Sequence, residues 1–504
     1  MPTKEHEEMG AKLSKAPSAE KGTVQDVDAS YLASQCAQPP DINIYMGGFV
    51  INTGYAPQMK RDFTWFQLFS CAFTVTNSWL GVTGGFSTGI SIGGSATLIY
   101  GLIIVAVFNV AIVITLGELM SSMPNAGGQY YWAMKLAPRK LANASAYICG
   151  ICNLLGGLTG MSSGAIASAY MILGCIKLVH PEFTIYAWHA VLIAIVFIMI
   201  TSVLNLSESL VRKSVLIGLW WCVASCYIIT IVPVSVAEEH ASPSFIFAST
   251  ENTSGWSSTG MAFLVGMINA NYAFGLIDAG VHLAEEIPQP ERNIPKALLA
   301  AVGIGFVTAW PVAVTLLDCI TDFDAIATTD TGVPLLHLLY FALRRNRAGA
   351  IILQLLSVVS YFWCLMAYLK KHSVPINAHL LCIALSCVLC FLPLASTTAF
   401  NSLVTGVLVF PYISILIPAT FSLLPMNKNI PKGSFSLGRW GTVARVVTVI
   451  FCLFATIIYA FPYTMLVDAG NINYFSAILG VVIIYAIIDW VVRARESFNQ
   501  NIPR

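Results

Sequence analysis

The stretch FLVGMINANYAFGLIDAGVHLAEE, residues 263–286, decides the fold. It is long and apolar enough to enter a bilayer, since about 20 helical residues cross the hydrocarbon. Its middle is unlike a plain span, because helix-weakening residues and one ionisable group gather within residues 269–280: Asn269, Asn271, Gly275, Asp278 and Gly280. A carboxylate at membrane depth is costly and normally faces a cavity or a partner. We predict a broken helix that forms half of a transport site; the alternative is a kinked span whose buried Asp278 bonds to a neighbour.

The composition indicates a membrane protein. Of 504 residues, 57% are hydrophobic and only 10% are charged, whereas soluble domains carry roughly 25% charged residues. The net charge is +1 and no basic run occurs, so nucleic acid is not an expected partner. We therefore expect an all-α polytopic protein whose surroundings are the lipid bilayer.

The apolar segments predict twelve transmembrane helices between polar ends. Residues 1–60 are expected to be a disordered cytosolic tail, residues 61–495 a transmembrane permease domain, and residues 496–504 a cytosolic C-terminal tail. The expected helices lie near 64–90, 96–120, 141–177, 185–205, 212–236, 258–285, 294–319, 347–369, 376–395, 399–424, 440–461 and 474–493.

The basic residues predict the orientation of these helices. With the N-terminus inside, four of the 26 lysines and arginines fall outside (Lys177, Arg344, Arg345 and Arg347), which leaves 22 on the cytosolic side. This is a strong positive-inside pattern. Asn252, followed by Thr253 and Ser254, is a candidate glycosylation site, and it falls in an expected exterior loop.

The twelve helices divide into two blocks of five and a final pair. Residues 62–236 form the first block and residues 256–424 the second, and helices 11 and 12 occupy 440–493. An odd number of spans inverts the second block relative to the first. The first helix of each block is interrupted, and in helix one the break falls near Thr76, Asn77, Ser78, Trp79 and Gly81. Paired broken helices in inverted repeats indicate the binding site of a secondary transporter.

Metal and catalytic chemistry are not expected. Cys149 and Cys152, and again Cys387 and Cys390, have metal or redox spacing, but both pairs lie in apolar helices without a neighbouring histidine or carboxylate. We interpret them as buried membrane cysteines. The eight histidines do not accompany a nucleophile at one depth, so an enzyme is disfavoured. We predict no catalytic residue, no metal site and no cofactor.

Four motifs carry a resemblance to a known family: TNSWLG (76–81), GGFSTGISIGG (84–94), GELMSSMPNAGGQYYW (117–132) and HLAEEIPQPERNIPKA (282–297). Over about residues 55–495 the sequence resembles the amino acid–polyamine–organocation superfamily, and within it the fungal amino acid/choline permeases, including choline permeases of the yeast type. The resemblance implies a LeuT-like fold of five plus five inverted helices and two peripheral ones. It also implies alternating access at the plasma membrane, with both termini cytosolic and H⁺ as the expected coupling ion.

The two helix breaks supply the expected substrate site. Amides at the helix-one break favour a substrate carboxylate, because helix N-termini carry partial positive charge. The rings of Trp79, Tyr272 and Phe274 are candidates to face a cation, although helix packing also explains each of them. By the resemblance, Asp278 is the candidate counter-ion or proton-linked group. The full set is Thr76, Asn77, Ser78, Trp79, Gly81, Asn269, Asn271, Tyr272, Phe274, Gly275 and Asp278.

A second group of charges lies at the expected cytosolic ends of helices two and six: Glu118, Glu285, Glu286 and Arg292. Ion pairs between them and the basic interior loops would close an inner gate. Exposed pairs contribute only about 0–1 kcal/mol, which suits a gate that opens in each cycle. The alternative is that these are solvated loop charges.

The sequence therefore predicts a secondary active transporter for a small organic cation or zwitterion, choline or an amino acid such as γ-aminobutyrate. One departure from the resembling family concerns the segment after helix eight, residues 368–379, which is shorter than in relatives. It leaves open an inactive product of a truncated gene model. A non-transporting nutrient sensor on the same fold is the other alternative.

Overall fold

The chain divides into two units, residues 1–58 and 59–504. The structure, a computed structural model, describes residues 43–46, 49–52, 64–206, 208–250, 252–368, 376–395, 397–427, 431–465, 467 and 472–495. In the first unit, strands β1 (Asn43–Met46) and β2 (Phe49–Asn52) form an antiparallel pair in which Asn43 lies opposite Asn52. They fall within the stretch predicted to be a disordered tail. The rest of that unit, and residues 496–504, lie outside the described residues.

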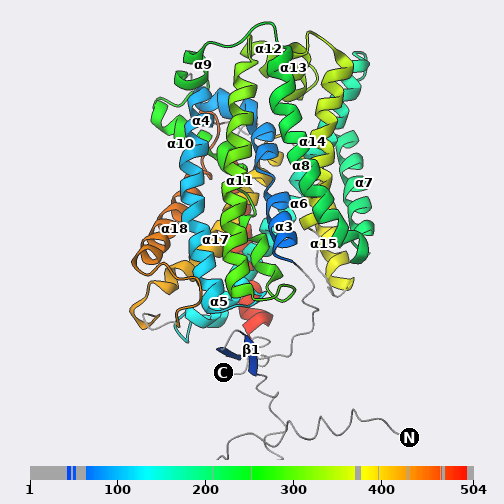
Figure 1. The fold of residues 1–504 in the computed structure, drawn as a ribbon. Helices are drawn as coiled ribbons and strands as arrows, with labels where there is room; N and C mark the ends of the chain where they lie inside the picture. Colours follow the sequence, from blue (N-terminus) through cyan, green and yellow to red (C-terminus); the bar gives the residue numbers. More distant parts are fainter. Residues whose placement is uncertain are drawn as a thin grey trace, which may run out of the picture. The chain divides into compact units, whose positions relative to one another are not determined.

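The regular secondary structure of the second unit consists of helices in its described residues (Figure 1). Its first half comprises α3 (Trp65–Thr76), α4 (Ser78–Ser122), α5 (Gly128–Leu136), α6 (Ala142–Val179), α7 (Ala187–Asn205), α8 (Glu208–Val236) and α9 (Pro243–Ala248). Its second half comprises α10 (Thr259–Tyr272), the 3-10 helix η1 (Ile277–Leu283), α11 (Pro290–Asp318), α12 (Phe323–Ala327), α13 (Pro334–Ala342), α14 (Arg347–Tyr368), α15 (Ile376–Leu389), α16 (Leu392–Ala395), α17 (Thr397–Ser422), the 3-10 turn η2 (Pro425–Asn427), α18 (Arg439–Ile458), α19 (Phe475–Asp489) and the π-helical turn η3 (Trp490–Ala494).

Eleven helices of the described residues are long and apolar enough to cross a membrane, against the twelve predicted. The difference arises at the first predicted span, 64–90, which is split between α3 and the beginning of α4. α4 then continues through Gly93 and Gly94, whose backbone angles are not helical, into the second predicted span. A count of twelve therefore requires α3 and the first residues of α4 to act as one interrupted helix.

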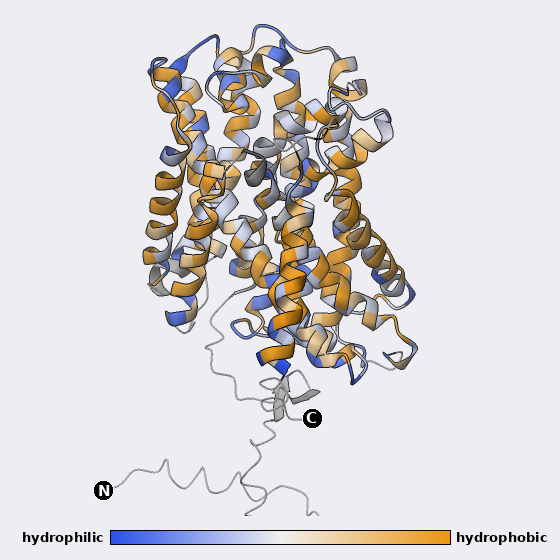
Figure 2. Ribbon diagram, turned by 180° about the vertical axis from the view of Figure 1, so that it is seen from behind, coloured by the Kyte–Doolittle hydropathy of each residue, from blue (hydrophilic) through white to orange (hydrophobic). Residues whose placement is uncertain are grey.

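Apolar side chains cover the outside of the helical unit. Figure 2 shows hydrophobic residues along the outer helices and hydrophilic residues towards the two ends. On α19, Val481, Ile484 and Tyr485 are all more than half exposed. A soluble protein rarely leaves so large an apolar surface in water, so this surface suits a bilayer.

The helices that carry the predicted breaks lie in the interior of the unit. α4 packs along α10 and α11, while α6 packs along α17, and α14 contacts both α3 and α6. The short helices lie at opposite ends, with α5 at one end and α9, α12 and α13 at the other (Figure 1). α11 and α14 contact both parts of the first interrupted helix, α3 and α4, and α17 contacts α10.

Candidate functional site

The first break is made by Asn77, between α3 and α4. Its backbone adopts the left-handed conformation, with φ 38° and ψ 57°, which asparagine tolerates better than most residues. Its side-chain Nδ2 donates to the Ser360 carbonyl at 3.5 Å, which ties the break to α14. α4 then begins at Ser78 without a side-chain cap. The amides of Leu80 and Gly81 donate to the Asn77 carbonyl at 2.8 and 3.2 Å, which leaves the amides of Ser78 and Trp79 without an intrahelical partner.

The second break follows Tyr272, where α10 ends and the chain turns before η1. Leu276 in this turn has φ 58°, an unusual conformation for a residue with a bulky side chain. α6 accommodates it at Gly160, where a Cβ would lie 2.7 Å from Leu276 Cδ1. The interruption predicted in helix six is present, and packing against α6 contributes to its position.

The two breaks approach each other closely. A Cβ on Gly81 would lie 2.7 Å from the Ala273 Cα and 3.0 Å from the Tyr272 carbonyl oxygen. Only glycine at this position lets the beginning of α4 approach the turn after α10 without displacing backbone.

A cavity of about 50 Å³ lies between the breaks. Five of the residues predicted for the substrate site line it: Thr76, Asn77, Gly81, Tyr272 and Gly275. The remaining wall consists of Val75, Leu80, Gly160, Gly164, Leu276, Tyr361, Cys364, Leu365 and Val407. Ligand pockets usually measure about 300–1,000 Å³, so this conformation is closed around the site.

Several polar atoms at the first break have no hydrogen-bond partner among the described residues. They are Thr74 Oγ1, Asn77 Oδ1 and Ser78 Oγ, all on side chains that are at least 98% buried. Nearly all buried polar atoms in proteins are paired. Of the three residues, Asn77 lines the cavity, so a bound solute or water there would satisfy its Oδ1.

Other residues predicted for the substrate site lie away from this cavity. Trp79 is fully buried in the main hydrophobic core, and Ser78 and Phe274 pack against Gly305 of α11. Asn269 packs against the glycines of α4, with its Oδ1 2.8 Å from a Cβ built on Gly85. In this structure the rings of Trp79 and Phe274 pack between helices in the hydrophobic core.

Asn271 belongs to a separate buried polar network between α4, α10, α17 and α18. Its Oδ1 accepts a hydrogen bond from the Tyr412 hydroxyl at 2.8 Å, and its Nδ2 donates to the Tyr459 hydroxyl at 3.0 Å. Asn109 Nδ2 lies 3.4 Å from the same Oδ1. The side chain of Asn271 therefore holds helices together and points away from the cavity.

Asp278 is also absent from the cavity wall. Its side chain is 4% exposed, and its Oδ2 accepts hydrogen bonds from Gln129 Nε2 at 2.5 Å and Asn153 Nδ2 at 3.1 Å. His282 Nε2 lies 3.9 Å from the same oxygen, and the other ring nitrogen of His282 lies 3.0 Å from the Ala126 carbonyl. This carboxylate thus joins η1 to α5 and α6.

A second, larger cavity of about 310 Å³ lies between α3, α5, α6 and η1. The wall of this cavity includes Cys71 and Val75 of α3, together with Asn153, His282 and His379. Val75 also lines the 50 Å³ cavity between the breaks. Tyr130 of α5 also lies in the wall of the larger cavity. Burial, together with the nearby Glu285 carboxylate, raises the pKa of Tyr130, so the phenol stays neutral.

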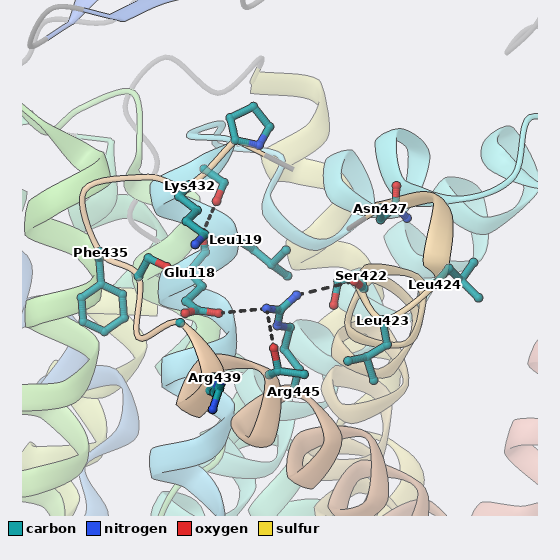
Figure 3. Close-up of a pocket in the computed structure, with 15 residues that line it drawn as sticks. Glu118, Leu119, Ser422, Leu423, Leu424, Asn427, Lys432, Phe435, Arg439 and Arg445 are labelled. Atoms are coloured by element: carbon teal, nitrogen blue, oxygen red, sulfur yellow. Dashed lines mark hydrogen bonds and ion pairs between the residues drawn. The ribbon is translucent and has the colours of Figure 1, made fainter. Parts of the chain in front are cut away.

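The predicted gate residues come from two parts of the chain. Glu118, at the end of α4, pairs with Arg445 of α18 through Oε2 and Nη2 at 3.5 Å (Figure 3). Its Oε1 accepts a hydrogen bond from the Leu437 amide at 2.8 Å. Glu285, Glu286 and Arg292 belong instead to the end of helix six and the beginning of α11. The inner gate stays a prediction for all four.

Other predictions have simpler outcomes. Asn252 lies in the loop between α9 and α10, where its Nδ2 donates to the Trp256 carbonyl at 2.7 Å. Of the four cysteines interpreted as buried, Cys149, Cys152 and Cys390 are buried, whereas Cys387 is only partly buried. In the part of the chain that the structure describes, no group of three metal-ligating side chains is present. The shortened connection after helix eight, residues 369–375, lies outside the described residues.

Sequence reasoning missed the contributions of α6 and α14 to the cavity. Gly160 and Gly164 stand four residues apart on α6, a spacing of small residues typical of close helix contacts in membranes. This pattern could have indicated them. Tyr361 of α14 lies beside the beginning of α4, where its hydroxyl oxygen would be 3.0 Å from a Cβ on Gly84. One aromatic residue in an apolar helix gives no such signal in the sequence.

Comparison with known proteins identifies the family. Residues 63–370 match the family described as "Amino acid permease". The chain belongs to the amino acid permease family. The choline transporter of Saccharomyces cerevisiae is 32% identical over 88% of this chain and 83% of its own length. The 7-keto 8-aminopelargonic acid transporter of the same yeast is 26% identical over 86% of this chain and 92% of its own.

The fold of this permease resembles that of a solved transporter structure. MhsT in complex with L-phenylalanine superimposes with a TM-score of 0.53 at 13% sequence identity, covering 80% of this chain and 99% of that one. The permease therefore has the LeuT-like fold predicted from its motifs. Family membership also makes it a membrane transporter of small molecules, in agreement with the prediction from its paired broken helices.

Proposed function

We propose that this permease is a secondary active transporter that moves a small organic cation or zwitterion, choline or an amino acid such as γ-aminobutyrate, across the plasma membrane by alternating access. The observation that carries the proposal is the cavity where two interrupted helices meet, with Asn77, whose Oδ1 has no hydrogen-bond partner among the described residues, in its wall. The 32% identity to a choline transporter favours choline among these substrates.

The chemistry of the cavity wall suits a quaternary ammonium group held without a salt bridge. None of the residues that line it is acidic, and Asp278 is occupied by Gln129 and Asn153. The rings of Tyr272 and Tyr361 are the aromatic surfaces of this wall. A cation on a desolvated ring gains about 0.5–2 kcal/mol. The uncapped beginning of α4 would receive the carboxylate of a zwitterion.

The closed cavity requires the two breaks to move during transport. At about 50 Å³ it is far smaller than the 310 Å³ cavity beside it. Val75 lines both cavities, so a shift of α3 would join them and open the site towards α5. Residues at both helix breaks, and the glycines of α6, would change contacts in this step.

The coupling ion is proposed to be H⁺, with Asp278 as the proton-linked group. The carboxylate is buried, and it bridges η1, α5 and α6 beside His282. Protonation would weaken the hydrogen bonds from Gln129 and Asn153, because a neutral carboxyl accepts less strongly than an ion. Release of α5 from η1 would follow.

The test is uptake of radiolabelled choline in yeast that lack their own choline permease, competed by a panel of amino acids and polyamines. We expect saturable uptake, with choline as the strongest competitor. In the Tyr361→Leu variant KM for choline should rise by about 2- to 30-fold, the effect of losing one cation–π contact. Tyr361→Phe keeps the ring and is the matched control.

Two results would contradict the proposal. If the protein reaches the plasma membrane and moves no compound of the panel, it is not a transporter of this substrate class. If Tyr361→Leu and Tyr361→Phe raise KM equally, the phenol hydroxyl contributes and the ring face does not bind the cation.

A further inference from the structure

A separate cavity of about 530 Å³ lies at the α5 end of the helical unit, between the ends of α4 and α17 and the beginning of α18. Figure 3 shows the side chains that surround it. None of its lining residues lines either of the cavities described above. It is therefore distinct from the cavity between the breaks, and its chemistry needs an explanation of its own.

The charge of this cavity is positive. Lys432, Arg439 and Arg445 line it, and Glu118 is the one acidic side chain of the wall. Both oxygens of Glu118 are already engaged, one by the Leu437 amide and one by Arg445. Lys432 and Arg439 are exposed and form no ion pair with a described residue. Two positive charges are therefore left for an anion.

Arg445 acts as a fixed part of the wall. Besides Glu118, its Nη1 lies 3.5 Å from the Ser422 carbonyl (Figure 3). Its Nε lies 3.3 Å from the Gly441 carbonyl. The contact with Ser422 joins α17 to α18, whereas the contact with Gly441 lies within α18. α18 begins at Arg439 after Gly438, which gives the helix no side-chain cap. The N-terminal amides of this 20-residue helix add partial positive charge at the cavity.

An exposed apolar stripe begins at the mouth of the cavity. Trp440 is 75% exposed beside Arg439, and tryptophan is enriched at membrane–water interfaces. Along α18, exposed side chains then recur at helical spacing on one face: Val443, Val446, Ile450, Leu453 and Ile457. This face runs from the basic cavity into the region of the bilayer hydrocarbon.

We infer that the cavity binds the headgroup of an anionic glycerophospholipid. Lys432 and Arg439 contact the phosphate and its anionic substituent, and the acyl chains lie along the exposed face of α18. Basic pockets between transmembrane helices at the cytoplasmic surface suit such headgroups. A free phosphate would match the charges and leave the apolar stripe without a partner. The bound lipid would join the ends of α4, α17 and α18.

The test uses the purified full-length protein in neutral detergent, titrated with dioleoyl-phosphatidylserine and, separately, with dioleoyl-phosphatidylcholine of the same acyl chains. Thermal stability and native mass spectrometry report binding. We expect saturable stabilisation by phosphatidylserine and none by phosphatidylcholine. In Lys432→Gln/Arg439→Gln the affinity for phosphatidylserine should fall about 10- to 30-fold.

The matched control is Arg139→Gln/Lys140→Gln. It removes two exposed positive charges from the α5–α6 connection, away from the cavity, and should leave lipid affinity unchanged. Equal losses in both double variants would mean that phosphatidylserine binds to surface charge in general, and would overturn the site. So would stabilisation by phosphatidylcholine equal to that by phosphatidylserine.

A third titration, with inorganic phosphate alone, separates a lipid from a free anion. Under the proposal phosphate stabilises the protein at most weakly. Stabilisation by millimolar phosphate that matches phosphatidylserine, and that is lost in Lys432→Gln/Arg439→Gln, would assign the cavity to a soluble anion and overturn the lipid.

Discussion

At the scale of single residues, Asp278 is the side chain on which the proposed coupling depends. Asp278→Asn keeps an oxygen that accepts hydrogen bonds from Gln129 and Asn153, and it removes the ionisable group. We expect choline uptake to fall by about tenfold or more, because hydrogen bonds to a charged group contribute about 1.5–3 kcal/mol. Uptake and surface abundance measured in the same cells check this.

Asp318→Asn is the matched control for this change. Asp318 ends α11, where its carboxylate lies 2.6 Å from His240 Nδ1, and it is only partly buried. The same chemical substitution there should leave uptake near the wild-type rate. Unchanged KM and maximal rate in Asp278→Asn would remove Asp278 from the mechanism.

The sequence predicted that Asp278 matters, yet not what it contacts. Its partner Gln129 lies 149 positions away in the chain, and no local pattern places that amide beside the carboxylate. Trp79 shows the opposite case. Its position at a helix break made it a candidate for the cavity, but its ring is buried in the core instead. Residue type and spacing indicate the break, while the direction of each side chain depends on neighbouring helices.

At the scale of elements, the contact between α4 and the turn after α10 predicts the effect of Gly81→Ala. The added Cβ would lie 2.7 Å from the Ala273 Cα, so backbone must move. Overpacking of this kind costs about 1–3 kcal/mol. We expect lower thermal stability of the purified protein and lower uptake, measured on the same preparation and in the same host.

Gly303→Ala is the control for that experiment. Gly303 lies within α11, and a Cβ there would meet no atom within 4 Å. Alanine also favours a helix interior over glycine by about 1 kcal/mol, so stability should stay equal or rise. Wild-type stability and uptake in Gly81→Ala would show that the two breaks do not need this close approach.

The two breaks also show where sequence reasoning ends at this scale. Asn77 was predicted from a cluster of polar residues and glycines, and it is the residue that adopts the left-handed conformation. In helix six the same reasoning drew attention to Gly275 and Gly280, whereas the positive φ belongs to Leu276. Leucine is not expected there from local preferences. Its placement depends on the space left by Gly160 of α6, a tertiary contact.

At the scale of the whole molecule, the charge pattern predicts an orientation that three glycosylation sequons can test. They begin at Asn143, Asn205 and Asn252. Asn143 lies at the beginning of α6 and Asn205 at the end of α7, both at the face predicted to be cytosolic, whereas Asn252 lies in the loop before α10 at the opposite face. Only sites on the exterior face pass through the secretory lumen, where the sugar is attached.

We therefore expect protein from a yeast host to carry at most one N-linked glycan, removable by endoglycosidase and absent in Asn252→Gln. Ser254→Ala breaks the same sequon and should give the same loss. Thr253→Ala changes the middle residue, preserves the sequon and should keep the glycan. A mobility shift that persists in Asn252→Gln and disappears in Asn143→Gln or Asn205→Gln would reverse the orientation. The cavity beside α5 would then face the exterior, and the basic cavity at α18 the outer leaflet.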